Sequence, residues 1–372
     1  MLIGVPKEIK NQEHRVGLTP NSVKEFVRDG HQVVVEAGCG SGIGFGDDDY
    51  KSAGATTSTQ AAEIFANADM IVKVKEPQPQ ECEMLRPGQM LYTYLHLAPD
   101  PQQTELLVKS GATCIAYETV TDDEGGLPLL APMSEVAGRM SIQAGAHHLE
   151  KTQGGRGMLL GGVPGVGPAR VTVIGGGVVG NNAAYMAVGL GADVSILDKS
   201  LPRLRQLDAE YRGRAKCIYS TRAKLEECVT DSDLVIGAVL IPGASAPKLV
   251  TREMISAMRS GSVVVDVAID QGGCFETSQA TTHEDPTYVI DDVVHYCVAN
   301  MPGGVARTST LALNNATLPF GLALANRGAK AALMSDAHLM NGLNVHNHQV
   351  TYEAVARDLG YDYVPGADAL SG

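Results

Sequence analysis

One segment constrains the fold of this chain more than any other. An apolar, β-branched run at residues 171–174 leads directly into Gly175, Gly177 and Gly180, and a segment of helical length follows. In a G-x-G-x-x-G loop the first glycine permits a tight turn, the second lets the backbone approach a pyrophosphate, and the third allows close helix packing. The next strand-like run ends at Asp198, near the usual spacing of about 20 residues. This order predicts a dinucleotide-binding α/β unit.

The acid at the end of the second run bears on which dinucleotide is bound. The carboxylate of Asp198 would accept a hydrogen bond from a ribose 2′-hydroxyl and repel a 2′-phosphate, which favours NAD over NADP. Arg203 and Arg205 keep NADP open, because a nearby arginine can hold a 2′-phosphate. The structural alternative is a glycine turn that serves sheet packing alone, with Asp198 capping the next helix.

The rest of the chain repeats the alternation of strand and helix. Short apolar runs predict strands at residues 2–5, 31–36, 70–74, 90–95 and 113–117, and again at 171–174, 194–197, 234–239 and 262–269. A first helix is expected after Thr19, a good N-cap, with Pro20 at its first position, and another at residues 102–109. Two longer helices are expected at residues 133–150 and 308–326.

This pattern predicts an α/β fold with two Rossmann-like, doubly wound domains. We expect residues 1–128 plus 308–372 to form a discontinuous substrate domain, and the NAD-binding domain, residues 129–307, to be inserted into it.

Charge and composition exclude several classes of partner. The formal net charge of −13 argues against nucleic acid and anionic lipid. Early charged residues leave no apolar core for a signal peptide. Residues 171–192 and 308–326 are uncharged, but their glycine, asparagine and proline content argues against a membrane span. Seven scattered cysteines without a C-x-x-C pair indicate reduced thiols, so we expect a cytoplasmic protein.

Four polar residues stand at or near the ends of predicted strands, where α/β sheets bind their ligands. Arg15 and Lys75 would suit an anionic substrate, because arginine pairs with a carboxylate and lysine can polarise a carbonyl. His96 could transfer a proton near neutral pH, and Asp270 could orient ammonia or water. Each residue also has a purely structural alternative. Arg15 and Lys75 could form surface ion pairs, His96 could be a core histidine, and Asp270 could cap a turn.

Several segments, in the same order, resemble the alanine dehydrogenase family from Met1 to the C-terminal tail. These segments are GVPKEIKNQEHRVGLTP at residues 4–20, KVKEP at 73–77, LHL at 95–97, PMSEVAGR at 132–139, GGVPG at 161–165, DVAIDQGG at 266–273 and VANMP at 298–302.

The resemblance implies roles for individual residues. Arg15 and Lys75 match the family's binders of the substrate carboxylate and carbonyl, and His96 and Asp270 match its two catalytic residues. The matching cofactor contacts, with the glycine loop, are Ser134, Gly175, Gly177, Val178, Val179, Gly180, Asp198, Arg203, Ser220, Val239, Leu240, Val267, Ala268, Ile269, Asp270, Val298, Ala299, Asn300 and Met301. Some members carry lysine at the position of Arg203, so a basic residue there also fits NAD.

No metal is expected. The ten histidines show no metal-ligand spacing. Some relatives bind magnesium through a glutamate and a histidine four residues apart on the late helix, but Ala323 and Arg327 stand at the matching positions here.

The implied activity is NAD-dependent, reversible oxidative deamination of L-alanine to pyruvate and ammonium, in a cytoplasmic homo-oligomer, since the family usually forms hexamers. Two alternatives stay open. One is the NAD-binding component of a proton-translocating transhydrogenase, which shares the two-domain plan and would need membrane subunits. The other is a non-catalytic NAD-binding module, which would not need Lys75, His96 and Asp270.

Overall fold

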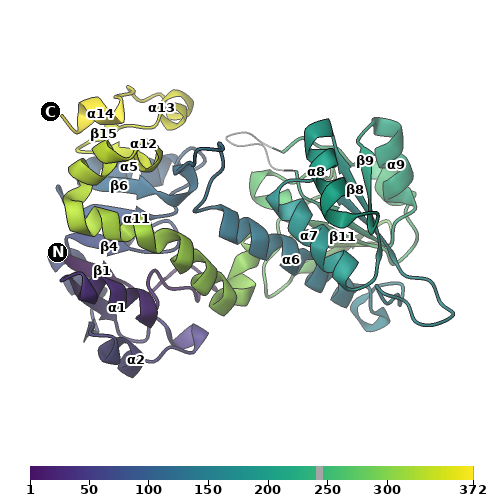
Figure 1. Cartoon of the computed structure of the whole chain (residues 1–372), viewed down its shortest axis with the longest axis horizontal. Coiled ribbons are helices and arrows are strands. Elements are labelled where there is room, and N and C mark those ends of the chain that lie inside the picture. The colour runs from purple at the N-terminus through teal and green to yellow at the C-terminus, as the bar shows by residue number, and fades with distance from the viewer. Residues whose placement is uncertain (240–245, 372) are drawn as a thin grey trace. The chain divides into compact units, whose positions relative to one another are not determined.

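The computed structural model describes residues 1–239 and 246–371, and the chain divides into two compact units (Figure 1). The first unit comprises Met1–Met133 and Val305–Gly372, and the second comprises Ser134–Gly304. Helix α6 (Ala131–His148) begins in the first unit and continues into the second.

The first unit is built on an eight-stranded sheet with the order β15-β14-β6-β5-β4-β1-β2-β3. Six of these strands are parallel and repeat the doubly wound order 3-2-1-4-5-6. The strands are β1 (Leu2–Val5), β2 (Gln32–Glu36), β3 (Thr56–Ser58), β4 (Met70–Val72), β5 (Met90–Thr93), β6 (Thr113–Ala116), β14 (Leu343–His346) and β15 (Gln349–Val350). Strand β14 pairs antiparallel with β6, so the C-terminal segment completes a sheet that the N-terminal third begins.

Helices connect these strands. They are α1 (Pro20–Arg28), α2 (Asp47–Ser52), α3 (Ala61–Asn67), α4 (Pro79–Cys82), α5 (Pro101–Ser110), α11 (Ala306–Ser335), α12 (Ala337–Met340), α13 (Glu353–Leu359) and α14 (Gly366–Ala369), with short 3₁₀ turns η1 (Ser41–Ile43) and η2 (Tyr117–Thr119). The predicted start of α1 is confirmed: the hydroxyl of Thr19 accepts from the N–H of Ser22, and Pro20 is the first helical residue. Helix α11 extends past the predicted residue 326 and is kinked at Gly328, where φ is 74°.

The second unit has a seven-stranded sheet, β12-β13-β11-β10-β7-β8-β9, again in the order 3-2-1-4-5-6 apart from the antiparallel edge strand β12. The strands are β7 (Arg170–Ile174), β8 (Asp193–Asp198), β9 (Ala215–Tyr219), β10 (Leu234–Gly237), β11 (Val263–Asp266), β12 (Thr287–Ile290) and β13 (Val293–Tyr296). The helices are α7 (Val178–Gly189), α8 (Leu201–Tyr211), α9 (Arg222–Thr230) and α10 (Arg252–Ser256), with 3₁₀ turns η3 (Lys151–Gln153), η4 (Val267–Gln271) and η5 (Met301–Val305).

In the central strands of this sheet, the side chains of successive residues pack into two different apolar clusters. Leu234 and Ile236 belong to one apolar cluster, whereas Val235 belongs to another. A strand buried on both faces needs a continuous apolar run, which is why these strands are visible in the sequence. The predicted α/β class, with two parallel-dominated sheets, is therefore confirmed. Within the described residues, no helix combines the length and the apolar character needed to cross a membrane.

Several predicted strands extend past the ends that the structure shows, and the difference is largest at β11. We expected residues 262–269 to be extended, but β11 ends at Asp266 and a 3₁₀ turn follows. The Asp266 carboxylate accepts from the N–H of Ala268 at 3.1 Å and thereby starts that turn. When an aspartate carboxylate accepts from the backbone N–H two residues later, this local hydrogen bond competes with the hydrogen bonds that would extend the strand.

Candidate active site

Three of the predicted substrate residues lie beyond the carboxyl ends of neighbouring strands in the first unit. Arg15 is in the segment after β1, Lys75 lies three residues after β4, and His96 lies three residues after β5. The strand order reverses between β1 and β4, and a doubly wound sheet binds its ligand outside the strands at this reversal. The fold therefore brings these three residues to the edge where a ligand is expected.

The guanidinium of Arg15 is buried and aligned by an acid of its own loop. Its Nε and Nη2 donate to the two carboxylate oxygens of Glu13 at 2.7 and 2.6 Å, and its Nη1 lies 3.2 Å from the Sδ of Met133. Burial alone would lower the pKa of Arg15, but Glu13 outweighs it and the pKa is raised. Arg15 is thus a rigid, charged fork rather than a mobile surface cation, and Glu13 is a partner that we did not predict.

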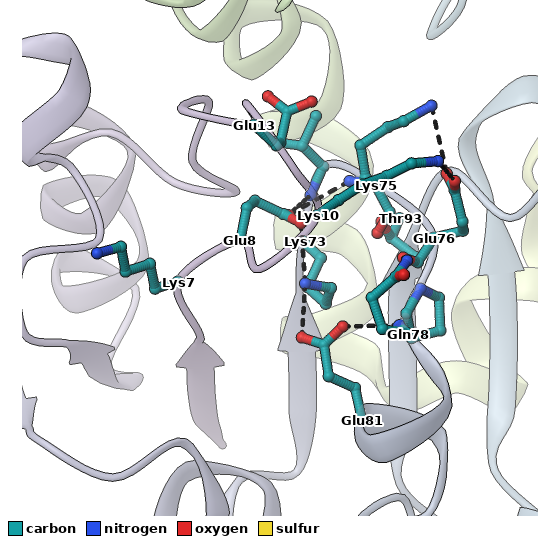
Figure 2. A network of polar contacts seen from close by, with 12 residues as sticks. Lys7, Glu8, Lys10, Glu13, Lys73, Lys75, Glu76, Gln78, Glu81 and Thr93 are labelled. Atoms are coloured by element: carbon teal, nitrogen blue, oxygen red, sulfur yellow. Dashed lines mark hydrogen bonds and ion pairs between the residues drawn. The ribbon is translucent and has the colours of Figure 1, made fainter.

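Lys75 lies in a small cluster of charges (Figure 2). Its Nζ is 3.3 Å from one carboxylate oxygen of Glu76, whose other oxygen bonds Lys10. Burial would raise the pKa of Glu76, but the charges of Lys75 and Lys10 outweigh it and lower the pKa. The side chain of Lys75 is only 15% exposed, against 42% for Lys10, so Lys75 is the more sheltered of the two cations.

His96 adopts a left-handed backbone conformation, with φ at 51°, which costs a non-glycine residue roughly 1–2 kcal/mol. Glu118 holds it there: the N–H of His96 donates to this carboxylate at 2.6 Å, and the Nδ1 of the ring lies 3.7 Å from the same oxygen. The ring stacks on Tyr94 with an interplanar angle of 4° and is 44% exposed. His96 is therefore an exposed, oriented imidazole and not a core histidine.

Glu118 was missed by sequence reasoning, although a signal existed. Strands β5 and β6 are parallel neighbours, with Thr93 paired to Ala116, so the residues after them lie side by side. An acid two residues beyond the end of β6 should therefore face the segment that carries His96.

In the second unit, the glycine loop follows β7 as predicted. At each of its three positions, glycine suits the local structure for a different reason. Gly175 has φ at 99°. A Cβ on Gly180 would lie 1.8 Å from the carbonyl oxygen of Gly175, so only glycine lets α7 start this close to the loop. A Cβ on Gly177 would meet nothing within 4 Å. Gly177 is the N-cap of α7 and has no side chain to occupy the N–H groups of the first helical turn.

The acid at the end of β8 lies against this loop. The carboxylate of Asp198 accepts from the N–H of Gly176 and from the N–H of Ser200, each at 2.7 Å. Arg203 reaches the same place, because its Nε donates to the carbonyl oxygen of Gly176 at 2.6 Å. The N-cap of α8 is Ser200, so Asp198 does not have the capping role that was its structural alternative.

The other predicted cofactor contacts of this unit follow the same edge of the sheet. Ser220 follows β9, and its N–H donates to the carbonyl of Asp198 at 2.9 Å; Val239 follows β10, and its side chain would lie 3.2 Å from a Cβ on Gly175. Val267, Ala268, Ile269 and Asp270 form the turn after β11, and Val298, Ala299, Asn300 and Met301 follow β13. Val178 and Val179 open α7, and Ser134 is on α6. Leu240 lies outside the described residues.

Asp270 is exposed on η4, and the buried Asp266 organises the turn that carries it. Besides Ala268, the Asp266 carboxylate accepts from the N–H of Cys274 at 2.8 Å and from the hydroxyl of Ser278. Burial raises the pKa of Asp266, although these hydrogen bonds favour its charged form. After Glu13 and Glu118, Asp266 is the third supporting acid that we did not predict from the sequence.

These residues fit a dinucleotide. A helix N-terminus capped by glycine, with open space where its side chain would be, suits a pyrophosphate, and a carboxylate beside the loop suits a ribose hydroxyl. Within residues 1–239 and 246–371, no three acidic, histidine or cysteine side chains are grouped so that they could hold a metal ion.

Comparison with known proteins finds relatives that match this chain over its whole length. The family profiles "Alanine dehydrogenase/PNT, N-terminal domain" and "Alanine dehydrogenase/PNT, C-terminal domain" match residues 4–137 and 141–353. The alanine dehydrogenase of Halomonas elongata is 63% identical over 370 residues, covering 100% of both chains.

Two solved structures are also similar. An L-alanine dehydrogenase has a TM-score of 0.94 and 53% identity, with 97% of this chain and 99% of that one covered. A transhydrogenase from Sinorhizobium meliloti has a TM-score of 0.82 and 28% identity, with 95% and 100% covered. The two family profiles and the full-length relative agree: this chain belongs to the alanine dehydrogenase/PNT family.

Proposed function

We propose that this protein is an NAD-dependent alanine dehydrogenase, which interconverts L-alanine and water with pyruvate and ammonium. The proposal rests on the full-length similarity to alanine dehydrogenases and on one geometric observation. Arg15, Lys75 and His96 all stand at the carboxyl edge of one sheet, around the point where its strand order reverses. The first unit then provides the substrate residues, and the second, with the glycine loop, binds NAD. We propose residues 1–128 plus 308–372 as the substrate domain and residues 129–307 as the NAD-binding domain, which lie close to the boundaries of the two compact units.

Each substrate residue has a defined task. Arg15, held by Glu13, binds the substrate carboxylate, and Lys75 places a positive charge beside the carbonyl oxygen of pyruvate. His96 moves protons as water adds to the imine that forms when alanine loses the hydride from Cα, and as the resulting carbinolamine releases ammonia. Asp270 orients ammonia or water. Bound NAD would supply the acceptor for the hydride that leaves Cα.

All the residues proposed to hold the cofactor belong to the second unit. The first turn of α7, with Gly175, Gly177 and Gly180, would hold the pyrophosphate, and Asp198 would accept from the ribose hydroxyl. Arg203, whose Nε is engaged by the loop carbonyl, is compatible with NAD.

The test is NADH oxidation by the purified protein with pyruvate and ammonium, followed by the loss of NADH absorbance. We expect oxidation that requires ammonium, since reduction of pyruvate to lactate would not. Hydride exchange between NADPH and an NAD analogue, without ammonium-dependent oxidation, would support the transhydrogenase component instead. Binding of NADH with neither reaction would support a non-catalytic module.

We further propose a cytoplasmic homohexamer, as is usual in this family. A hexamer of the 39.1 kDa chain has a mass of about 235 kDa, and such closed assemblies are symmetric. Sedimentation equilibrium of the full chain measures this mass directly, and a concentration-independent mass of one or two chains would contradict the hexamer.

A further inference from the structure

A buried ion cluster of Lys73, Glu8 and Glu81 lies next to the segment that carries Lys75 (Figure 2). The ammonium of Lys73 has no exposed surface and sits 2.9 Å from an oxygen of Glu8 and 2.8 Å from an oxygen of Glu81. The two carboxylates are 2% and 3% exposed. Burial would lower the pKa of Lys73, but the two acids outweigh it and raise the pKa, and burial raises the pKa of Glu8. Desolvating three charges is costly, so the cluster is poorly explained by stability alone.

Glu8 links this cluster to the backbone of Lys75. Its second oxygen accepts from the N–H of Val74 at 2.6 Å and from the N–H of Lys75 at 3.3 Å. One carboxylate therefore binds the buried ammonium with one oxygen and two successive backbone amides with the other.

The carbonyl groups of the same segment are also held. The hydroxyl of Tyr117 donates to the carbonyl of Lys73 at 3.0 Å, and the hydroxyl of Thr93 donates to the carbonyl of Lys75 at 3.0 Å. The N–H of Tyr94 donates to the carbonyl of Val74 at 3.2 Å. The backbone of residues 73–75 is therefore hydrogen-bonded on both sides: two of its N–H groups donate to Glu8, and its three carbonyl groups accept from Tyr117, Tyr94 and Thr93.

Glu81 shares the ammonium of Lys73 but serves a different segment. Its second oxygen accepts from the N–H of Gln78 at 2.8 Å, at the start of α4. Glu8 and Glu81 are thus matched in charge, burial and ionic partner, and they differ in the backbone that each one holds.

We propose that Glu8 is a positioning residue for substrate binding: charge-balanced by Lys73, it fixes the backbone of Lys75 so that its ammonium stands where the carbonyl oxygen of pyruvate binds. This inference rests on the proposed function, in which Lys75 contacts the substrate. A displacement of about 1 Å in such a group can cost about 100-fold in rate.

The matched acids give the experiment its control. Glu8→Met and Glu81→Met each leave Lys73 with one carboxylate, so both variants should lose melting temperature to a similar extent. Only Glu8→Met should lose kcat/KM for pyruvate, by about 10- to 100-fold, with the KM and Kd for NADH unchanged. Glu81→Met should keep the wild-type kcat/KM. The measurements are NADH oxidation at varied pyruvate, NADH fluorescence titration and thermal unfolding, all on the full chain.

Equal losses of kcat/KM in the two variants would overturn the inference, as would a parallel rise in the KM for NADH and for pyruvate in Glu8→Met. If the methionine variants do not fold, Glu8→Gln and Glu81→Gln keep a polar group at each site and are compared by the same criteria. A wild-type protein that does not oxidise NADH would overturn the proposed function itself, whereas an active wild type with equivalent variants would overturn only the role of Glu8.

Discussion

At the scale of single residues, Lys75 and Lys10 are two ammonium groups on one carboxylate, Glu76, but in different surroundings. Lys75 is sheltered at the strand-end edge, and Lys10 is exposed. Lys75→Ala should lower kcat about 10²–10³-fold, because it removes the charge beside the carbonyl oxygen, while NADH still binds. Lys10→Ala should change kcat less than about fivefold, since an exposed ion pair is worth at most about 1 kcal/mol.

Steady-state kinetics and NADH fluorescence titration measure both effects. Loss of NADH binding in Lys75→Ala would contradict the assignment of Lys75 to the substrate. An equal loss of turnover in the two variants would show that the charge of the cluster matters and the position of Lys75 does not.

At the scale of elements, the start of α7 contains two glycines that differ in the space around them. Gly180 packs against the carbonyl of Gly175, whereas nothing occupies the Cβ position of Gly177. Gly180→Ala should therefore destabilise the protein by about 1–3 kcal/mol through overpacking. Gly177→Ala should cost less than about 1 kcal/mol but weaken NADH binding at least about tenfold, since its methyl group would stand where the pyrophosphate approaches.

Thermal unfolding and NADH titration of the two variants check this pair. If Gly177→Ala bound NADH like the wild type, the pyrophosphate would have to lie elsewhere than at the first turn of α7.

The elements also show what the sequence can reveal. Strands such as β1 and β7 were predictable because both of their faces are buried, which demands apolar runs. Strand β9 was not predicted, since it is an edge strand with an exposed lysine, Lys216, and its pattern is broken. The end of β11 was mispredicted because a side chain, Asp266, and not the apolar pattern, decides where the strand stops.

The candidate site, like the fold, was predictable from the sequence only in part. Residues at strand ends could be found because parallel strands share one carboxyl edge. Glu118 and Glu8 could not be found so easily, because their contacts depend on which strands are neighbours. Glu13 lies only two residues from Arg15, but nothing in the local sequence shows that its carboxylate turns back onto the guanidinium.

At the scale of the whole molecule, buried and half-buried histidines should make the free energy of unfolding depend on pH. His295 is fully buried, bonded through Nδ1 to the carbonyl of Val293 and through Nε2 to Thr277, and stacked on Tyr288. Burial lowers the pKa of His295, and it also lowers those of His148 and His346. The unfolded chain binds these protons below about pH 6.5, and the folded chain binds them less readily. The free energy of unfolding should therefore fall as the pH drops from about 7 to 5.

Chemical denaturation at several pH values measures this slope. His295→Asn, whose amide can still donate to the carbonyl of Val293, should have a smaller slope than the wild type. The raised pKa values of Glu8 and Asp266 act in the opposite direction but are common to both proteins, so they cancel in the comparison. An unchanged slope in His295→Asn would contradict the assignment.

The pairing of β14 with β6 has a consequence for biosynthesis. During translation β6 emerges early, but its outer neighbour begins at Leu343, near the end of the chain. The second unit, Ser134–Gly304, is continuous and is fully synthesised while that edge of the first sheet still lacks its strand. An unpaired strand edge is a template for wrong partners, and the nascent chain carries this exposed edge from the synthesis of Ala116 until the synthesis of Leu343. The part of the protein made first is the last to be completed.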